Sequence, residues 1–281
     1  MQDLVTLEEH ACFGGTQGFY EHASGTIGLP MRLGVYLPPQ AAQGPVPVLY
    51  YLAGLTCNEQ TFAIKAGAQQ HAARLGLALV TPDTSPRATG VAGADQDWDF
   101  GHGAGFYLDA QAEPYAQHWR MESYVAQELP QVLQRHFAVD TARAGIFGHS
   151  MGGHGALTLA LRHPGLYRSV SALAPICAPS EVPWGEKAFG GYLGNDRDAW
   201  AAHDAVQLVR RGARVPPLLV DQGLADQFLA TQLRPERLEE ACAAAGQPLQ
   251  LRRHGRYDHG YFFVASFVAD HLEHHAAAFA V

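Results

Sequence analysis

Residues 142–163 read ARAGIFGHSMGGHGALTLALRH, and this stretch decides the fold. An apolar run typical of a strand ends at GHSMG (148–152), and a pattern typical of a helix follows at once. Glycines on both sides of the serine permit a tight turn that leaves its hydroxyl exposed above the sheet. The helix N-terminus behind it offers N–H groups and a positive dipole to an oxyanion. The stretch favours Ser150 as a nucleophile over the alternative, a serine that only caps the helix.

Similar strand-like and helix-like runs alternate along the rest of the chain. Near-continuously apolar strands separated by helices indicate a mostly parallel sheet that helices cover on both faces. No long polar linker or internal repeat interrupts the pattern, so we expect one domain over residues 1–281. The expected strands are 32–39, 46–54, 75–83, 143–150, 168–175, 216–223 and 248–254, and the expected helices lie near 59–74, 120–136, 151–163, 197–211, 232–245 and 261–276.

A serine nucleophile needs a base, and the base needs an acid that orients it. In a sheet of this kind the acid is expected between the serine and the base along the chain. Asp226 lies in the short loop after the strand 216–223, where its carboxylate can turn toward the carboxyl ends of the strands. Asp221, at the end of the same strand, stays open as an alternative on spacing alone.

Fifteen histidines make position the only guide to the base. His259 follows the last expected strand by five residues and directly precedes the last helix, so it is the preferred base. His254 at the strand end and His149 beside the serine are weaker candidates, and we expect His149 to pack under the turn. Three further histidines have a helical spacing that could bind a metal, but we interpret them as a solvated helix face: His271, His274 and His275.

Acyl transfer also needs two N–H donors for the negative charge that develops on the substrate oxygen. The backbone N–H of Met151, directly after the nucleophile, is the first expected donor. The second is expected from the loop after the strand 46–54, where Leu55 follows Gly54. An ordinary glycine turn is the alternative reading of that loop.

Composition excludes several classes of protein. The net charge is −8 at pH 7 and no basic block stands out, which disfavours nucleic-acid binding and membrane-surface binding. No apolar stretch approaches the roughly 18 residues of a membrane span, and the first ten residues, MQDLVTLEEH, do not resemble a signal peptide. The four cysteines are far apart and form no CxxC pair, which favours a reducing compartment. We therefore expect a cytoplasmic protein.

Several longer motifs resemble one family, the S-formylglutathione hydrolases, also called the esterase D family, within the α/β-hydrolase fold. The similarity extends over nearly the whole chain, and some of its motifs are far more specific than G-x-S-x-G. The motifs are CFGGTQGFYEH (12–22), LAGLTCNEQTF (52–62), PDTSPR (82–87), DWDFGHGAGFYLDA (97–110), MESYVAQELP (121–130), IFGHSMGGHGAL (146–157), PWGEKAFGGYLG (183–194), DQGLAD (221–226) and YDHGYFF (257–263).

The resemblance implies hydrolysis of S-formylglutathione to formate and glutathione, a step of formaldehyde detoxification. It implies Ser150 as nucleophile with Asp226 and His259, which decides against Asp221, and Leu55 and Met151 as oxyanion donors. These groups suffice for the reaction, so no metal or organic cofactor is expected. A homodimer is a further expectation of the resemblance.

The short interval between Ser150 and Asp226 leaves little room for a large lid, so we expect a shallow pocket for small acyl groups. Four residues are candidates for its lining: Cys57, Trp98, Phe106 and Trp184. The chain departs from the usual family pattern at Ala88, Thr89, Arg256, Gly260 and residues 178–182, and we expect these positions to border the pocket.

Two other functions fit parts of the same pattern. A broader short-chain carboxylesterase or an acyltransferase could use the same three side chains. A catalytically silent binding protein with this fold is the alternative outside enzymes, and the intact Ser150, Asp226 and His259 weigh against it.

Overall fold

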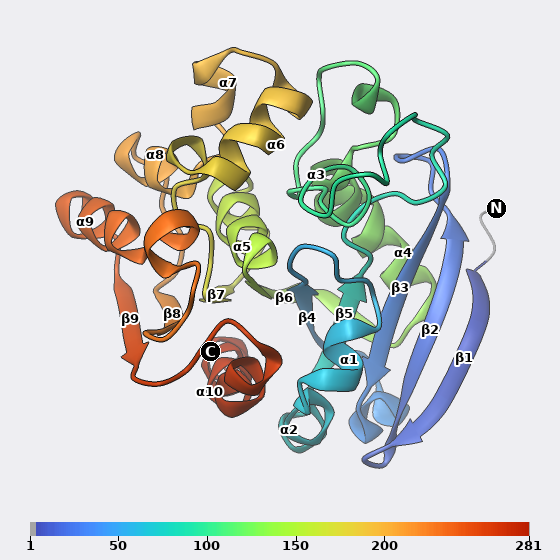
Figure 1. The fold of residues 1–281 in the computed structure, drawn as a ribbon. Coiled ribbons are helices and arrows are strands. Elements are labelled where there is room, and N and C mark those ends of the chain that lie inside the picture. The colour runs from blue at the N-terminus through green and yellow to red at the C-terminus, as the bar shows by residue number, and fades with distance from the viewer. Residues whose placement is uncertain (1–3, 281) are drawn as a thin grey trace.

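The computed structural model describes residues 4–280, and one sheet runs through them in the order β1-β2-β3-β5-β4-β6-β7-β8-β9 (Figure 1). Neighbouring strands pair antiparallel from β1 to β5 and parallel from β5 to β9. The predicted mostly parallel sheet is therefore confirmed. The strands are β1 Leu4–Cys12, β2 Gly15–Ala23, β3 Pro30–Leu37, β4 Val46–Leu52, β5 Ala78–Pro82, β6 Val139–His149, β7 Ser169–Leu173, β8 Leu218–Gly223 and β9 Leu249–His254.

Helices cover both faces of this sheet (Figure 1). On one face α10 packs against α2 and against β6, β7 and β8; on the other, α5 packs against β4, β6 and β7, with α8 beside it. The helices are α1 Thr61–Lys65, α2 Ala68–Leu75, α3 Met121–Ser123, α4 Leu129–His136, α5 Met151–Arg162, α6 Pro183–Leu193, α7 Arg197–Ala201, α8 Ala205–Arg210, α9 Pro235–Ala245 and α10 Tyr261–Phe279.

The central strands are buried on both faces, which is why they read as unbroken apolar runs. Every residue of β5 and of β7 is buried. In α5, every residue from Met151 to Leu161 is buried as well. The region around the carboxyl ends of β4 and β6 is thus a tightly packed part of the core.

The sequence predicted neither the β1–β2 hairpin nor helix α6, and three expected helices, 59–74, 120–136 and 197–211, are each divided. The β1–β2 hairpin gave no alternating apolar signal because β1 is a largely exposed edge strand that carries Glu8 and Glu9. The glycines of helix α6 weaken its helical signal in the sequence, and the same glycines let the helix pack closely against its neighbours. Gly67, with φ +66°, separates α1 from α2, and the Asp204 side chain caps α8 where one longer helix was expected.

The expectation of a solvated histidine face on the last helix is wrong for two of its three members. His271 and His275 are fully buried, one turn apart on the face of α10 that meets the sheet. His275 bonds Ser169 at 2.6 Å and Ser171 at 2.9 Å, and His271 bonds Ser171 at 2.8 Å. Alternate serines of β7 point to the same side of the sheet, so they meet these two histidines together.

Asp221 lies at the centre of the same buried network and joins β8 to β9 and α10. Its carboxylate accepts bonds from Arg252 at 2.6 and 2.5 Å and lies 3.1 Å from both His254 and His271. Burial opposes ionisation of Asp221, but the hydrogen bonds from His271 and Arg252 outweigh it and hold the pKa of the carboxyl below its usual value. Asp221 is therefore a charged structural residue.

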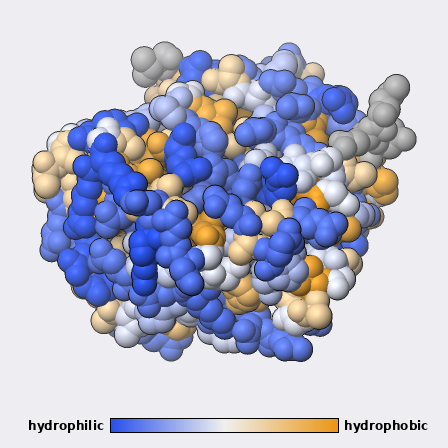
Figure 2. Space-filling view, turned by 90° about the horizontal axis from the view of Figure 1, so that it is seen from above, coloured by the Kyte–Doolittle hydropathy of each residue, from blue (hydrophilic) through white to orange (hydrophobic). Residues whose placement is uncertain are grey.

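The face of the molecule seen from above is mainly polar (Figure 2). On the face seen from above, outside the grey atoms, hydrophobic residues are scattered among hydrophilic ones and do not gather into one broad patch (Figure 2). None of the helices between residues 4 and 280 combines the length and apolar character needed to cross a membrane.

We predict that Asp221→Asn lowers the free energy of unfolding by about 2–4 kcal/mol, because it removes the fully buried carboxylate that pairs with the partly buried Arg252. Arg252 keeps its bond to Asp270 at 2.7 Å, which limits the loss. Chemical denaturation of the variant and the wild type measures the difference. A variant as stable as the wild type would show that the network does not hold β8, β9 and α10 together.

Candidate active site

Ser150 occupies a strained turn between β6 and α5. Its backbone has φ 59° and ψ −121°, a conformation that costs a non-glycine residue of order 1–3 kcal/mol. Gly152 makes the turn possible, because a Cβ there would lie 1.9 Å from the carbonyl oxygen of Leu52 at the end of β4. The Ser150 N–H donates to Leu173 of β7 at 3.0 Å. The strand-turn-helix expected from the sequence is present, and it presents the hydroxyl at the carboxyl ends of the strands.

The structure brings Ser150, His259 and Asp226 together in one chain of hydrogen bonds. His259 Nε2 lies 2.9 Å from Ser150 Oγ, and His259 Nδ1 lies 2.5 Å from Asp226 Oδ2. A carboxylate only accepts hydrogen bonds, so Nδ1 carries the proton of this pair and Nε2 is left to accept the serine O–H. Asp226 is held by the Phe228 N–H at 2.8 Å and by Gln222 at 3.3 Å.

The alternative acid and bases lie elsewhere or serve other contacts. Asp221 and His254 bond each other within the structural network, away from the serine. His149 is buried with its ring centroid 4.6 Å from that of His259, and burial lowers the pKa of His149 well below its usual value. A neutral His149 forms part of the pocket wall, a role that the sequence did not reveal.

The hydroxyl of Ser150 faces a pocket of about 260 Å³. Three of the four expected lining residues are there: Cys57, Trp98 and Trp184, the two indoles forming an edge-to-face pair with centroids 5.6 Å apart. The prediction that Phe106 lines the pocket is wrong. Phe106 is fully buried and packs against His154 and Phe189 in the core, because the loop that carries it folds inward beneath the site.

Besides His149 and His259, five residues that the sequence analysis did not assign to the pocket also line it. Proximity in sequence was an available signal for Gly54, Phe228 and Tyr261, which lie within two residues of Leu55, Asp226 and His259. Thr61 and Lys65 lie six and ten residues after Leu55 and had no such signal. The five residues are Gly54, Thr61, Lys65, Phe228 and Tyr261.

The N–H groups of Leu55 and Met151 can donate hydrogen bonds to a negative oxygen. Neither donates to a backbone carbonyl within residues 4–280. Leu55 lines the pocket with Ser150, and Gly54 before it packs so closely that an added Cβ would lie 3.1 Å from the Ser150 Cβ. The arrangement supports the expected pair of oxyanion donors.

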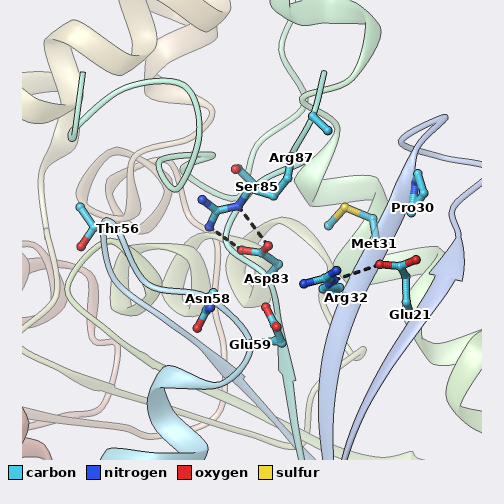
Figure 3. A pocket seen from close by; sticks show the side chains of 11 residues that line it. Glu21, Pro30, Met31, Arg32, Thr56, Asn58, Glu59, Asp83, Ser85 and Arg87 are labelled. Carbon is cyan, nitrogen blue, oxygen red and sulfur yellow. Dashed lines mark hydrogen bonds and ion pairs between the residues drawn. The ribbon is translucent and has the colours of Figure 1, made fainter. Parts of the chain in front are cut away.

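Hydrogen bonds on the side away from the pocket hold the loop that carries Leu55. Thr84 Oγ1 donates to the Cys57 carbonyl at 2.6 Å, and Arg87 donates to the same oxygen at 3.1 Å. Arg87 is itself fixed by Asp83, at 2.7 and 3.0 Å (Figure 3). The Thr56 N–H donates to Gly103 at 2.9 Å. These bonds fix the loop without touching the pocket.

Figure 3 shows the hollow of about 470 Å³ that lies on this side of the loop. It is lined by charged residues, among them Arg32 and the buried Glu59, whose pKa is raised by burial and by the nearby Asp83. The hollow contains none of Ser150, His259 and Asp226. The chemistry therefore belongs to the smaller pocket.

The positions that depart from the family pattern do not line the pocket, although Gly260 stands between two residues that do, His259 and Tyr261. None of Ala88, Thr89, Arg256, Gly260 and residues 178–182 lines the pocket of Ser150. Ala88 and Arg256 have φ of +51° and +69°, the left-handed region where glycine is the least strained residue. These two departures thus affect the backbone conformation and not the wall of the pocket.

Comparison with known proteins agrees with this geometry. The esterase family model, described as "Putative esterase", matches residues 24–274. The S-formylglutathione hydrolase of Mus musculus is 51% identical over 276 residues, 97% of this chain and 98% of the mouse protein. The chain belongs to the S-formylglutathione hydrolase family.

Solved structures place the fold in the same way. An S-formylglutathione hydrolase from Agrobacterium tumefaciens superposes with a TM-score of 0.96 at 48% identity, covering 98% of this chain and 99% of that one. The serine hydrolase FphF of Staphylococcus aureus, at 20% identity, has a TM-score of 0.72, with 93% and 98% covered, and shares the fold. The α/β-hydrolase fold implied by the sequence is confirmed.

We predict that Cys57→Ala keeps most of the turnover of the wild type. Burial raises the pKa of the Cys57 thiol, so it is disfavoured as a thiolate nucleophile, although it lies in the pocket wall. Bulky maleimides should inactivate the wild type by filling the pocket and should spare the variant. Loss of turnover in a well-folded Cys57→Ala, as severe as in Ser150→Ala, would mean that the thiol takes part in bond making.

Proposed function

We propose that this chain is a serine thioesterase that hydrolyses S-formylglutathione to formate and glutathione. The observation that carries the proposal is the hydrogen-bonded Ser150, His259 and Asp226 in a chain that is about half identical, over nearly its full length, to S-formylglutathione hydrolases. The reaction releases as formate a one-carbon unit that glutathione carries as a formyl thioester, already oxidised from the level of formaldehyde.

The first half of the reaction forms a formyl-enzyme. His259 Nε2 takes the proton of Ser150, and the serine oxygen attacks the formyl carbonyl. The N–H groups of Leu55 and Met151 stabilise the oxyanion. The carbon–sulfur bond then breaks, and the sulfur of glutathione receives the proton from His259.

Water completes the reaction by the same route. His259 accepts a proton from water, the hydroxide attacks the formyl ester, and the Ser150 oxygen leaves with that proton as formate is released. Asp226 holds the imidazole in the tautomer that these steps require and stabilises its positive charge. The steps use only groups of the chain, so the proposal needs no metal or organic cofactor.

The pocket favours a small acyl group over a large one. Its walls are aromatic side chains, including Trp184 and Phe228, and its volume of about 260 Å³ is small for a drug-sized ligand. A broader short-chain carboxylesterase remains the second candidate, because such walls also suit a small aryl ester.

A cytoplasmic location and a homodimer are parts of the same proposal. All four cysteines are unpaired in the structure, which suits a reducing compartment. The homodimer follows from the resemblance and stays a prediction.

Substitution of the proposed catalytic groups should abolish turnover without unfolding the protein. Ser150→Ala and His259→Ala are each expected to lower kcat by about 10⁴-fold or more, because nucleophile and base act as a unit. Asp226→Asn should lower kcat by roughly 10³- to 10⁴-fold. Asp221→Asn is the matched control and should retain turnover at a temperature where it is folded. The reverse ranking of the two aspartates would refute the assignment of the acid.

The substrate is tested by comparing kcat/KM on S-formylglutathione, S-acetylglutathione and an aryl acetate. We expect the formyl thioester to be the best substrate, since the pocket suits a small acyl group and the family acts on this thioester. A clear preference for the aryl acetate would instead identify a short-chain carboxylesterase.

A further inference from the structure

One cation stands at the pocket of Ser150. Lys65, the last residue of α1, lines that pocket together with Cys57 and Tyr261. Among the lining residues within 4–280 it is the one lysine or arginine, and no aspartate or glutamate lies beside it. The charge next to the reacting serine is therefore positive, although the chain as a whole carries −8.

The chain has two lysines, and their surroundings differ. Lys187 forms ion pairs with Asp97 at 2.9 Å and with Asp99 at 2.5 Å. Lys65 forms no ion pair within residues 4–280; its ammonium lies 5.7 Å from the centre of the Tyr261 ring. Its positive charge acts at the pocket wall, where it partly offsets the raised pKa of Cys57. Lys65 is thus an exposed cation that pairs with no carboxylate in the described part of the chain, residues 4–280.

The substrate named under the proposed function supplies the missing counter-charge. Glutathione is a tripeptide with a carboxylate on each side of its thiol residue and one ammonium, so its thioester is an anion. A tripeptide spans roughly 10 Å when extended, so each carboxylate of glutathione lies within about that distance of the thioester. A thioester held at Ser150 therefore places a carboxylate at the rim of a pocket of this size.

We propose that Lys65 is a specificity-determining residue that binds a carboxylate of the glutathione moiety and so separates glutathione thioesters from uncharged esters. The inference rests on the proposed function and deepens it. Lys65 takes no part in bond making. It attracts an anionic substrate to a protein whose net charge repels it, and it orients the leaving group through one charge-assisted contact.

The test compares two substrates in four variants. Lys65→Met should lower kcat/KM on S-formylglutathione about fivefold, mainly by raising KM, the size expected for an exposed ion pair. Its kcat/KM on an uncharged aryl acetate should stay within about twofold of the wild type, because no ion pair forms there. Lys65→Arg should keep most of the thioester activity, and Lys65→Glu should lose more than Lys65→Met. Lys187→Met, which removes the paired lysine, is the matched control and should leave kcat/KM on both substrates unchanged.

The substrate can be changed in the same way as the enzyme. Glycyl and γ-glutamyl monoesters of S-formylglutathione each lack one carboxylate. The monoester that lacks the carboxylate bound by Lys65 should have a lower kcat/KM with the wild type and an unchanged kcat/KM with Lys65→Met. High salt should lower kcat/KM on the thioester more for the wild type than for Lys65→Met, because salt screens the ion pair that only the wild type forms.

Three results would overturn the inference. An equal loss on both substrates in Lys65→Met would mean that Lys65 only supports Tyr261 and the pocket wall. No loss on the thioester would mean that another group recognises glutathione, and the proposed function would stand. A wild type that hydrolyses the aryl ester but not S-formylglutathione would remove the proposed function and this inference together.

Discussion

The close packing of the first turn of α5 against the end of β4 is the constraint on which the site depends. Gly152 has no room for a side chain beside the Leu52 carbonyl, and Gly54 has little beside Ser150. These two contacts set the serine, its strained backbone and both expected oxyanion donors within one rigid unit. Rigid placement matters because donors stabilise a developing charge best when they need not move to meet it.

The other half of the site depends on buried polar bonds instead of close packing. The network around Asp221 ties β8 and β9 to α10, and the loops that carry Asp226 and His259 leave from the ends of those elements. The Asp221 carboxylate thus holds the strand and helix ends from which the loops of the acid and the base begin, although it takes no part in the proposed reaction. Two aspartates five residues apart have separate tasks, one structural and one proposed as catalytic.

Local patterns predicted what local structure determines. The turn at Ser150 depends on the flanking glycines and on the adjoining strand and helix, so the sequence was sufficient there. The choice between Asp221 and Asp226 was not local, because it depends on which carboxylate meets Arg252 and which meets His259. The resemblance to a family, not spacing, decided that choice.

Tertiary contacts explain the wrong predictions. His271 and His275 look like a polar face in sequence, but two serines of β7 together with Asp221 satisfy their ring nitrogens within the core. Phe106 belongs to a motif near the site, yet its loop turns it inward. Lys65 carries no signal in sequence, since its significance comes from its place in the pocket wall, where no acidic residue of the range 4–280 pairs with it.

The central claim is that Ser150 is the nucleophile in a pocket that holds a glutathione thioester. Its most direct test is to label the protein with a fluorophosphonate and map the adduct by mass spectrometry, with and without the unreactive analogue S-methylglutathione. The account predicts an adduct on Ser150 that the analogue slows. An adduct on another residue, or labelling of Ser150 that the analogue does not slow, would contradict it.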